Sequence, residues 1–92
     1  MGNPFQEGKK LQNQLRELDK KMAEGESIPL SRIESILSQL QSVGNMGLAY
    51  NPMGLGGLLK QRINHVIKKT KEDLANPNIF IVEGGFVRRV IK

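Results

Sequence analysis

Two β-rich runs on either side of a Gly-Gly pair near the C-terminus constrain this chain more than any other feature. Residues 79–82 read Ile-Phe-Ile-Val and residues 86–91 read Phe-Val-Arg-Arg-Val-Ile, a pattern that predicts a tight β-hairpin. Side chains alternate along a strand, so both faces of this hairpin are mainly apolar. A lone hairpin with two apolar faces is not stable in water. We therefore expect it to pack on a helix and to gain a third strand, either from Gly47–Asn51 or from a second copy of the chain.

A narrow apolar stripe predicts a first helix from Phe5 to Glu24. Asn3 and Pro4 are suited to its N-cap and first position, and Gly25 to a left-handed C-terminal cap. The stripe recurs at alternating spacings of four and three and consists of Leu11, Leu15, Leu18 and Met22. Because the stripe is narrow and flanked by charges of mixed sign, it predicts an oligomer interface, with packing inside the chain as the alternative.

A second helix is expected to follow at once. Ser31 with Glu34 matches a capping box, and Ser27 ahead of Pro29 is an equally good start. Its apolar side runs from Leu30 to Val43, and the short connection predicts an antiparallel helical hairpin over residues 5–43. Residues 44–57 contain five glycines and one proline and no charge, so we expect a long Gly-rich loop there.

The third expected helix, over residues 55–75, is amphipathic and basic. Its apolar residues fall within about a third of the circumference at 100° per residue. One flank of the remainder carries Lys60, Asn64, Lys68 and Lys71, and the other carries Arg62, His65 and Lys69. Asn76-Pro77 is expected to end the helix. The predicted fold is α+β, mainly α: one domain over residues 1–92 with a helical hairpin, a third amphipathic helix and a β-hairpin over residues 78–92.

Charge is distributed unevenly along the 92 residues. The first 46 carry six basic and six acidic side chains, whereas residues 47–92 carry eight basic and three acidic ones, which is the whole net charge of +5. Such asymmetry favours a polyanionic partner, with a solvated basic face as the alternative.

The inventory of reactive side chains argues against an enzyme. The chain has no Cys and a single histidine, His65, so a thiolate nucleophile, a Cys-His couple and a multi-His metal site are excluded within it. The Gly-rich stretch from Gly54 to Lys60 matches neither the dinucleotide fingerprint nor the phosphate-binding loop of nucleotide hydrolases. We therefore predict a non-enzymatic protein with no catalytic residue, metal or cofactor.

Nucleic-acid binding is the first functional hypothesis. A basic helix followed directly by a β-hairpin is the element order in which a winged helix meets DNA, although a dozen residues rather than three or four separate the second and third helices. DNA is favoured over RNA, because Phe80 and Phe86 are expected in the core rather than stacked on bases. The predicted phosphate contacts are Lys60, Arg62, Asn64, Lys68, Lys69, Lys71, Arg88, Arg89 and Lys92.

The alternative hypothesis is an assembly or adaptor protein, of the kind found among small structural or regulatory proteins of phages and viruses. It would act through protein-protein contacts, with an acidic protein as a possible partner. Under either hypothesis a homodimer is expected, since C2 symmetry is the commonest way to cover unpaired apolar surface. A membrane partner is not expected, because the apolar arc of the third helix is needed by the core. The N-terminus lacks a signal-peptide pattern, which predicts a cytoplasmic or virion-associated protein.

Overall fold

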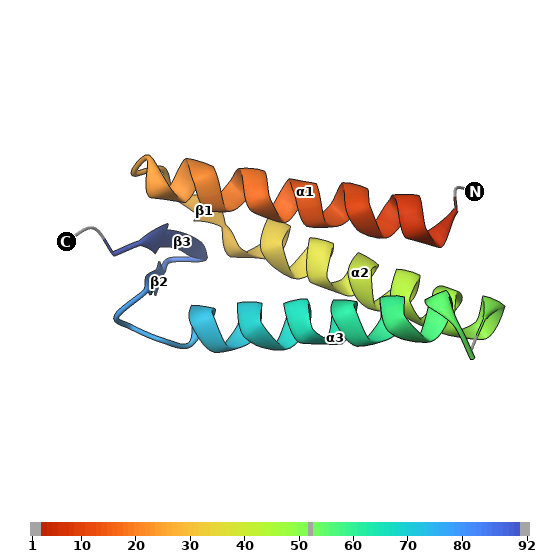
Figure 1. Cartoon of the computed structure of the whole chain (residues 1–92). Coiled ribbons are helices and arrows are strands. Elements are labelled where there is room, and N and C mark those ends of the chain that lie inside the picture. The colour runs from red at the N-terminus through yellow and green to blue at the C-terminus, as the bar shows by residue number, and fades with distance from the viewer. Residues whose placement is uncertain (1–2, 52, 91–92) are drawn as a thin grey trace.

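The computed structural model describes residues 3–51 and 53–90. Three helices and three short strands follow one another as α1 (Pro4–Ala23), β1 (Ile28–Pro29), α2 (Leu30–Tyr50), α3 (Leu55–Leu74), β2 (Phe80–Glu83) and β3 (Phe86–Arg89) (Figure 1). The predicted class, α+β and mainly α with a C-terminal antiparallel hairpin, is confirmed.

The residues at the two ends of α1 cap the helix as the sequence predicts. The Asn3 side chain accepts a hydrogen bond from the Phe5 backbone N–H at 2.8 Å, and Pro4 occupies the first turn, where its missing N–H has no cost. Gly25 closes the helix with φ of +95°, a backbone angle that residues with a Cβ rarely adopt. The predicted bounds of α1 are therefore right to within a residue.

The start of α2 differs from both alternatives. Leu30 is its first residue, with Pro29 as a cap that has no side-chain hydrogen bond, so neither Ser27 nor the Ser31 capping box begins the helix. The reason lies outside the helix. The Leu30 N–H donates to the Gly85 carbonyl at 2.8 Å, so the C-terminal hairpin, rather than a serine, satisfies this helix start.

The predicted Gly-rich loop over residues 44–57 is wrong for most of its length. α2 continues through Gly44 and Gly47 to Tyr50, and only residues 51–54 separate it from α3. Glycines inside a helix weaken it, but here they let two helices approach closely. A Cβ on Gly56 of α3 would lie 2.9 Å from the Gly47 carbonyl carbon and closer still to the carbonyl oxygens of Gly47 and Asn51. Close helix packing outweighs the low helical propensity.

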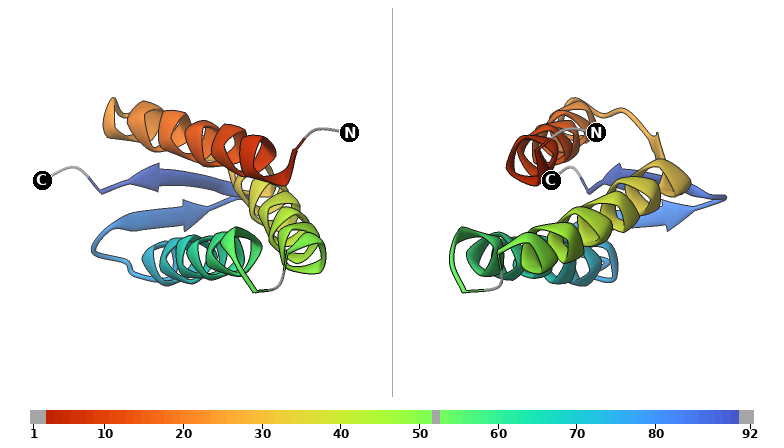
Figure 2. Two further views of the ribbon diagram at one scale, coloured as in Figure 1. Left: turned by 45° about the vertical axis from the view of Figure 1, so that its right-hand side comes forward. Right: turned by 90° about the vertical axis from the view of Figure 1, so that its right-hand side faces the viewer.

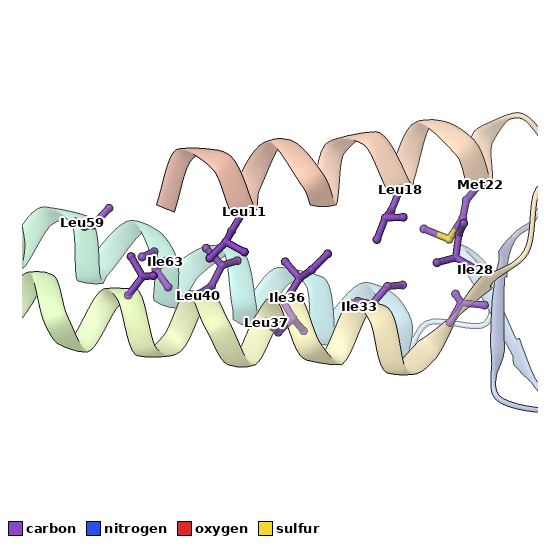
Figure 3. Packing of buried hydrophobic residues seen from close by; sticks show 12 residues of the cluster. Leu11, Leu18, Met22, Ile28, Ile33, Ile36, Leu37, Leu40, Leu59 and Ile63 are labelled. Atoms are coloured by element: carbon purple, nitrogen blue, oxygen red, sulfur yellow. The ribbon is translucent and has the colours of Figure 1, made fainter. Parts of the chain in front are cut away.

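α2 lies between the other two helices and packs against both. α1 and α3 run in one direction and α2 in the other (Figure 1), in a molecule with extents of 43 × 23 × 20 Å. Their apolar side chains point toward one another across the bundle (Figure 3). The core comprises Leu11, Leu18, Met22, Ile28, Ile33, Ile36, Leu37, Leu40, Val43, Leu59, Ile63 and Val87.

The stripe on α1 belongs to this core. Leu11, Leu18 and Met22 are buried within the single chain, and Leu15 is partly buried against them. These four residues had been predicted to form an oligomer interface. Their burial corresponds to the other interpretation, packing inside the chain, because α2 and its neighbours already cover the stripe.

The third strand of the sheet comes from an unexpected place. The strand order is β1-β3-β2, with Ile28 paired to Val87 and Val82 paired to the same Val87 from the other side. Neither Gly47–Asn51, where residues 47–50 are helical, nor a second copy supplies this strand. The hairpin lies between the C-terminal halves of α1 and α3 (Figure 2). Val87 is fully buried, whereas Phe86, on the opposite face, is half exposed.

Candidate nucleic-acid interface

The α2–α3 pair carries a long stretch without acidic residues. Between Glu34 near the start of α2 and Glu72 near the end of α3 there is no Asp or Glu. α2 has no charge at all after Glu34, and α3 contributes five basic residues within this stretch, namely Lys60, Arg62, Lys68, Lys69 and Lys71. The stretch itself therefore carries only positive charge, and carboxylates adjoin it at Glu72 and Asp73 near the end of α3.

The flank of α3 that faces α2 brings together more of the predicted contact residues than any other described surface. Asn64, Lys68 and Lys71 are exposed and line a shallow hollow of about 420 Å³, whose other lining residues are Gln41 of α2, Ile67 and the acidic Glu72. Lys60 lies further toward the start of α3 on the same flank, where its ammonium donates a hydrogen bond to Asn45 Oδ1 of α2. Two amides, two free ammonium groups and a positioned lysine can donate hydrogen bonds to an anion such as a phosphate.

The other flank of α3 is different in character. The Lys69 ammonium lies 3.8 Å from an Asp73 carboxylate oxygen one turn further on, so its charge is partly offset. His65 and Lys69 line a mainly apolar groove of about 260 Å³ between α1 and α3. Arg62 is exposed on this side. Among the residues that the structure describes, neither Arg62 nor His65 has a carboxylate within 4.0 Å.

The two hairpin arginines lie on opposite faces of the sheet. Arg89 shares the helix-facing side with Val87, and its guanidinium lies 3.6 Å from the Asp19 carboxylate of α1, with both side chains half exposed. Arg88 is exposed on the outer face, paired across the strands with Ile81. Lys92, also predicted to contact phosphate, lies outside the described residues.

The structure thus separates the predicted residues into groups. It brings Asn64, Lys68 and Lys71 together, pairs Lys69 and Arg89 with carboxylates, and leaves Arg62 and Arg88 apart from the first group. Sequence reasoning missed Gln41 and Asn45 of α2. The signal was present in their polarity. Asn45 fell in the predicted loop, and Gln41 fell in the predicted second helix, which nothing in the sequence placed beside α3.

No metal-binding cluster is present in the described part of the chain, where no three His, Cys, Asp or Glu side chains gather. Within the same residues, none of the helices combines the length and the apolar character needed to cross a bilayer. No protein-family model, curated protein or solved structure matches the chain.

Proposed function

We propose that this chain is a non-enzymatic nucleic-acid-binding protein that holds a DNA backbone against α3. The observation that carries the proposal is the stretch between Glu34 and Glu72, which has no acidic residue and from which five cations project along one helix. Four of the five have no carboxylate within 4.0 Å among the described residues, and Lys69 is the exception. Phosphate contacts supply most sequence-independent affinity for DNA, and they require cations that are not already neutralised by neighbouring carboxylates.

The connectivity supports this proposal. A hairpin follows α3, and the connection between α2 and α3 spans only residues 51–54, including Gly54, within the length seen in helix-turn-helix proteins. The sequence objection to a winged-helix comparison, a dozen intervening residues, therefore no longer holds. The helix directions differ, however. α2 and α3 lie side by side in opposite directions (Figure 1), whereas helix-turn-helix pairs cross at about 90–120°.

This arrangement favours contact along the DNA backbone over reading of base edges. The side of α3 toward α2 is covered along its length by that antiparallel helix, so Asn64, Lys68 and Lys71 present donors over the hollow beside Gln41. Such donors position a protein on DNA without carrying sequence information. We therefore expect weak sequence preference.

A salt titration tests the proposal. Among the described basic residues that were predicted to contact phosphate, Lys69 and Arg89 are paired with carboxylates. The other five are Lys60, Arg62, Lys68, Lys71 and Arg88. If all five meet phosphates, log affinity for duplex DNA should fall with log salt at a slope of about −4.5, which is a loss of about 500-fold between ~50 and ~200 mM salt. Fluorescence anisotropy of a labelled duplex measures both values, and light scattering gives the mass of the complex.

The outcome that excludes the proposal is an absence of binding at the lower salt concentration. A binding constant that does not change with salt would also exclude it, because contact with phosphates releases counterions. The proposal is made for the single chain, since the α1 stripe predicted to mediate a dimer is buried in the core.

A further inference from the structure

The end of the molecule where α2 meets α3 exposes apolar side chains that the core does not use. We name these residues the tip: Leu48, Tyr50, Met53, Leu55 and Leu58. Tyr50 is 86% exposed, Met53 96% and Leu55 64%. The core takes Leu59 and Ile63 from the apolar arc of α3, whereas Leu55, at the start of that arc, is left exposed and belongs to the tip. Several exposed large apolar side chains at one end of a molecule are typical of an interaction site.

Basic side chains lie on α1 and α3 next to the tip, on the side toward the middle of the molecule. Lys60 and Arg62 follow the first residue of α3 by five and seven positions, which is about 7–10 Å at 1.5 Å per residue. A side chain at Gly8 of α1 would meet Leu59 of α3 at 3.5 Å, so the neighbouring Lys9 and Lys10 lie at the same level. We name Lys9, Lys10, Lys60 and Arg62 the collar. Glu7 is the acidic residue closest to it in the sequence.

The combination of tip and collar fits an anionic lipid surface. Interfacial protein segments bury their apolar side chains about 5–10 Å below the headgroups, and lysine or arginine near the surface is attracted to anionic lipids. The 7–10 Å between Leu55 and the collar residues of α3 would place the cations at headgroup level when Leu55 and the tip residues before it are inserted, with Leu58 nearer the headgroups. The tip itself contains no charged residue, since none occurs between Ser35 and Leu59.

We propose that the tip inserts into the interface of an anionic bilayer while the collar binds its headgroups. A second copy is the competing occupant, but two tips meeting end to end would bring two positively charged collars together, which opposes association. A bilayer with anionic lipids attracts the same charges. The collar shares Lys60 and Arg62 with the proposed DNA contacts, but the tip is separate from the hollow beside Lys68 and Lys71, and insertion into a bilayer does not depend on nucleic-acid binding.

Tyr50 gives a direct readout, because it is the only tyrosine and the chain has no tryptophan. Vesicles of phosphatidylcholine alone and of phosphatidylcholine with phosphatidylglycerol are mixed with the full chain, and binding is measured by cosedimentation. Acrylamide quenching of Tyr50 fluorescence is followed in parallel. We expect binding to the anionic vesicles to exceed binding to the neutral ones by at least about tenfold, and Tyr50 to become protected from acrylamide on binding.

Paired variants separate insertion from simple adsorption of a basic protein. Met53→Glu with Leu55→Glu changes the tip, and Gln14→Glu with Ser38→Glu makes the same charge change at exposed polar positions. The tip variant should bind anionic vesicles at least about tenfold more weakly than the control variant, since insertion would have to bury two carboxylates. Both variants should bind duplex DNA alike, and their circular dichroism should match that of the unchanged chain.

Three results would overturn the proposal. One is equal vesicle binding by the tip variant and its control, which would mean adsorption through the basic side of α3. Another is protection of Tyr50 without vesicles, together with a doubled mass in light scattering, which would assign the tip to a second copy. The third is no binding to the anionic vesicles. Failure of DNA binding alone would leave the lipid proposal standing.

Discussion

Replacing Gly56 with alanine should destabilise the fold by at least about 3 kcal/mol, a large part of the stability of a domain this small. The added methyl group would overlap the backbone carbonyls of Gly47 and Asn51, and its nearest carbon neighbour would lie at 2.9 Å. These are backbone atoms, which cannot rotate away as a side chain can. The variant can fold only if α3 moves away from the end of α2. Thermal and urea unfolding followed by circular dichroism at 222 nm measure the effect.

Gly44→Ala is the matched control on α2. Its Cβ would meet Ile63 side-chain atoms at 3.5 and 3.6 Å, which is ordinary van der Waals contact. Alanine favours a helix over glycine by up to about 1 kcal/mol, so this variant should be as stable as the unchanged chain or slightly more stable. Equal destabilisation by the two substitutions would contradict the close α2–α3 contact at Gly56.

Reversing the two free lysines beside the hollow, Lys68→Glu with Lys71→Glu, should weaken duplex DNA binding by about 10- to 100-fold at low salt. Both side chains are exposed, and neither has a carboxylate within 4.0 Å among the described residues. Loss of two phosphate contacts should also make the salt slope shallower by about 2, since each contact contributes about one unit. Anisotropy titrations at several salt concentrations measure both changes.

Lys20→Glu with Lys21→Glu supplies the control for charge. These lysines are exposed in the last turn of α1, as Lys71 is in the last turn of α3. Both double variants therefore lower the net charge by the same amount and place glutamates near the C-terminal end of a helix. We expect a loss of affinity of no more than about threefold, from the altered overall field. If both pairs weaken binding equally, α3 is not the contact surface and only the net charge matters.

Features set by neighbouring residues were predictable from the sequence. The bounds of α1 follow from Asn3-Pro4 and Gly25, and the hairpin turn from Gly84-Gly85, which both adopt positive φ. The apolar arc of α3 correctly gave its buried side at Leu59 and Ile63, but not at Leu55, which is exposed. In each case the stabilising interaction is local, within a few residues of the pattern that reveals it.

Features set by distant residues were not predictable in the same way. Gly44 and Gly47 look like helix breakers until Ile63 and Leu59 of α3 are placed against them. Ile28 resembles the start of a helix until β3 is seen to pair with it. The candidate site also depends on residues that are distant in the sequence. Gln41 of α2 and Lys68 of α3 line the same hollow, and Asp19 of α1 pairs with Arg89 of β3.

The pairing of β1 with β3 also has a consequence for how quickly the parts assemble. Ile28 and Val87 are roughly 60 residues apart, so closing that loop in an unfolded chain costs about 3–4 kcal/mol of entropy. The two helical hairpins close over a few residues each and carry no comparable cost. We therefore expect the helices to dock first and the sheet to form after the rate-limiting step. Val87→Ala should then accelerate unfolding in stopped-flow experiments while leaving the refolding rate nearly unchanged; a slower refolding rate would place the sheet in the folding nucleus.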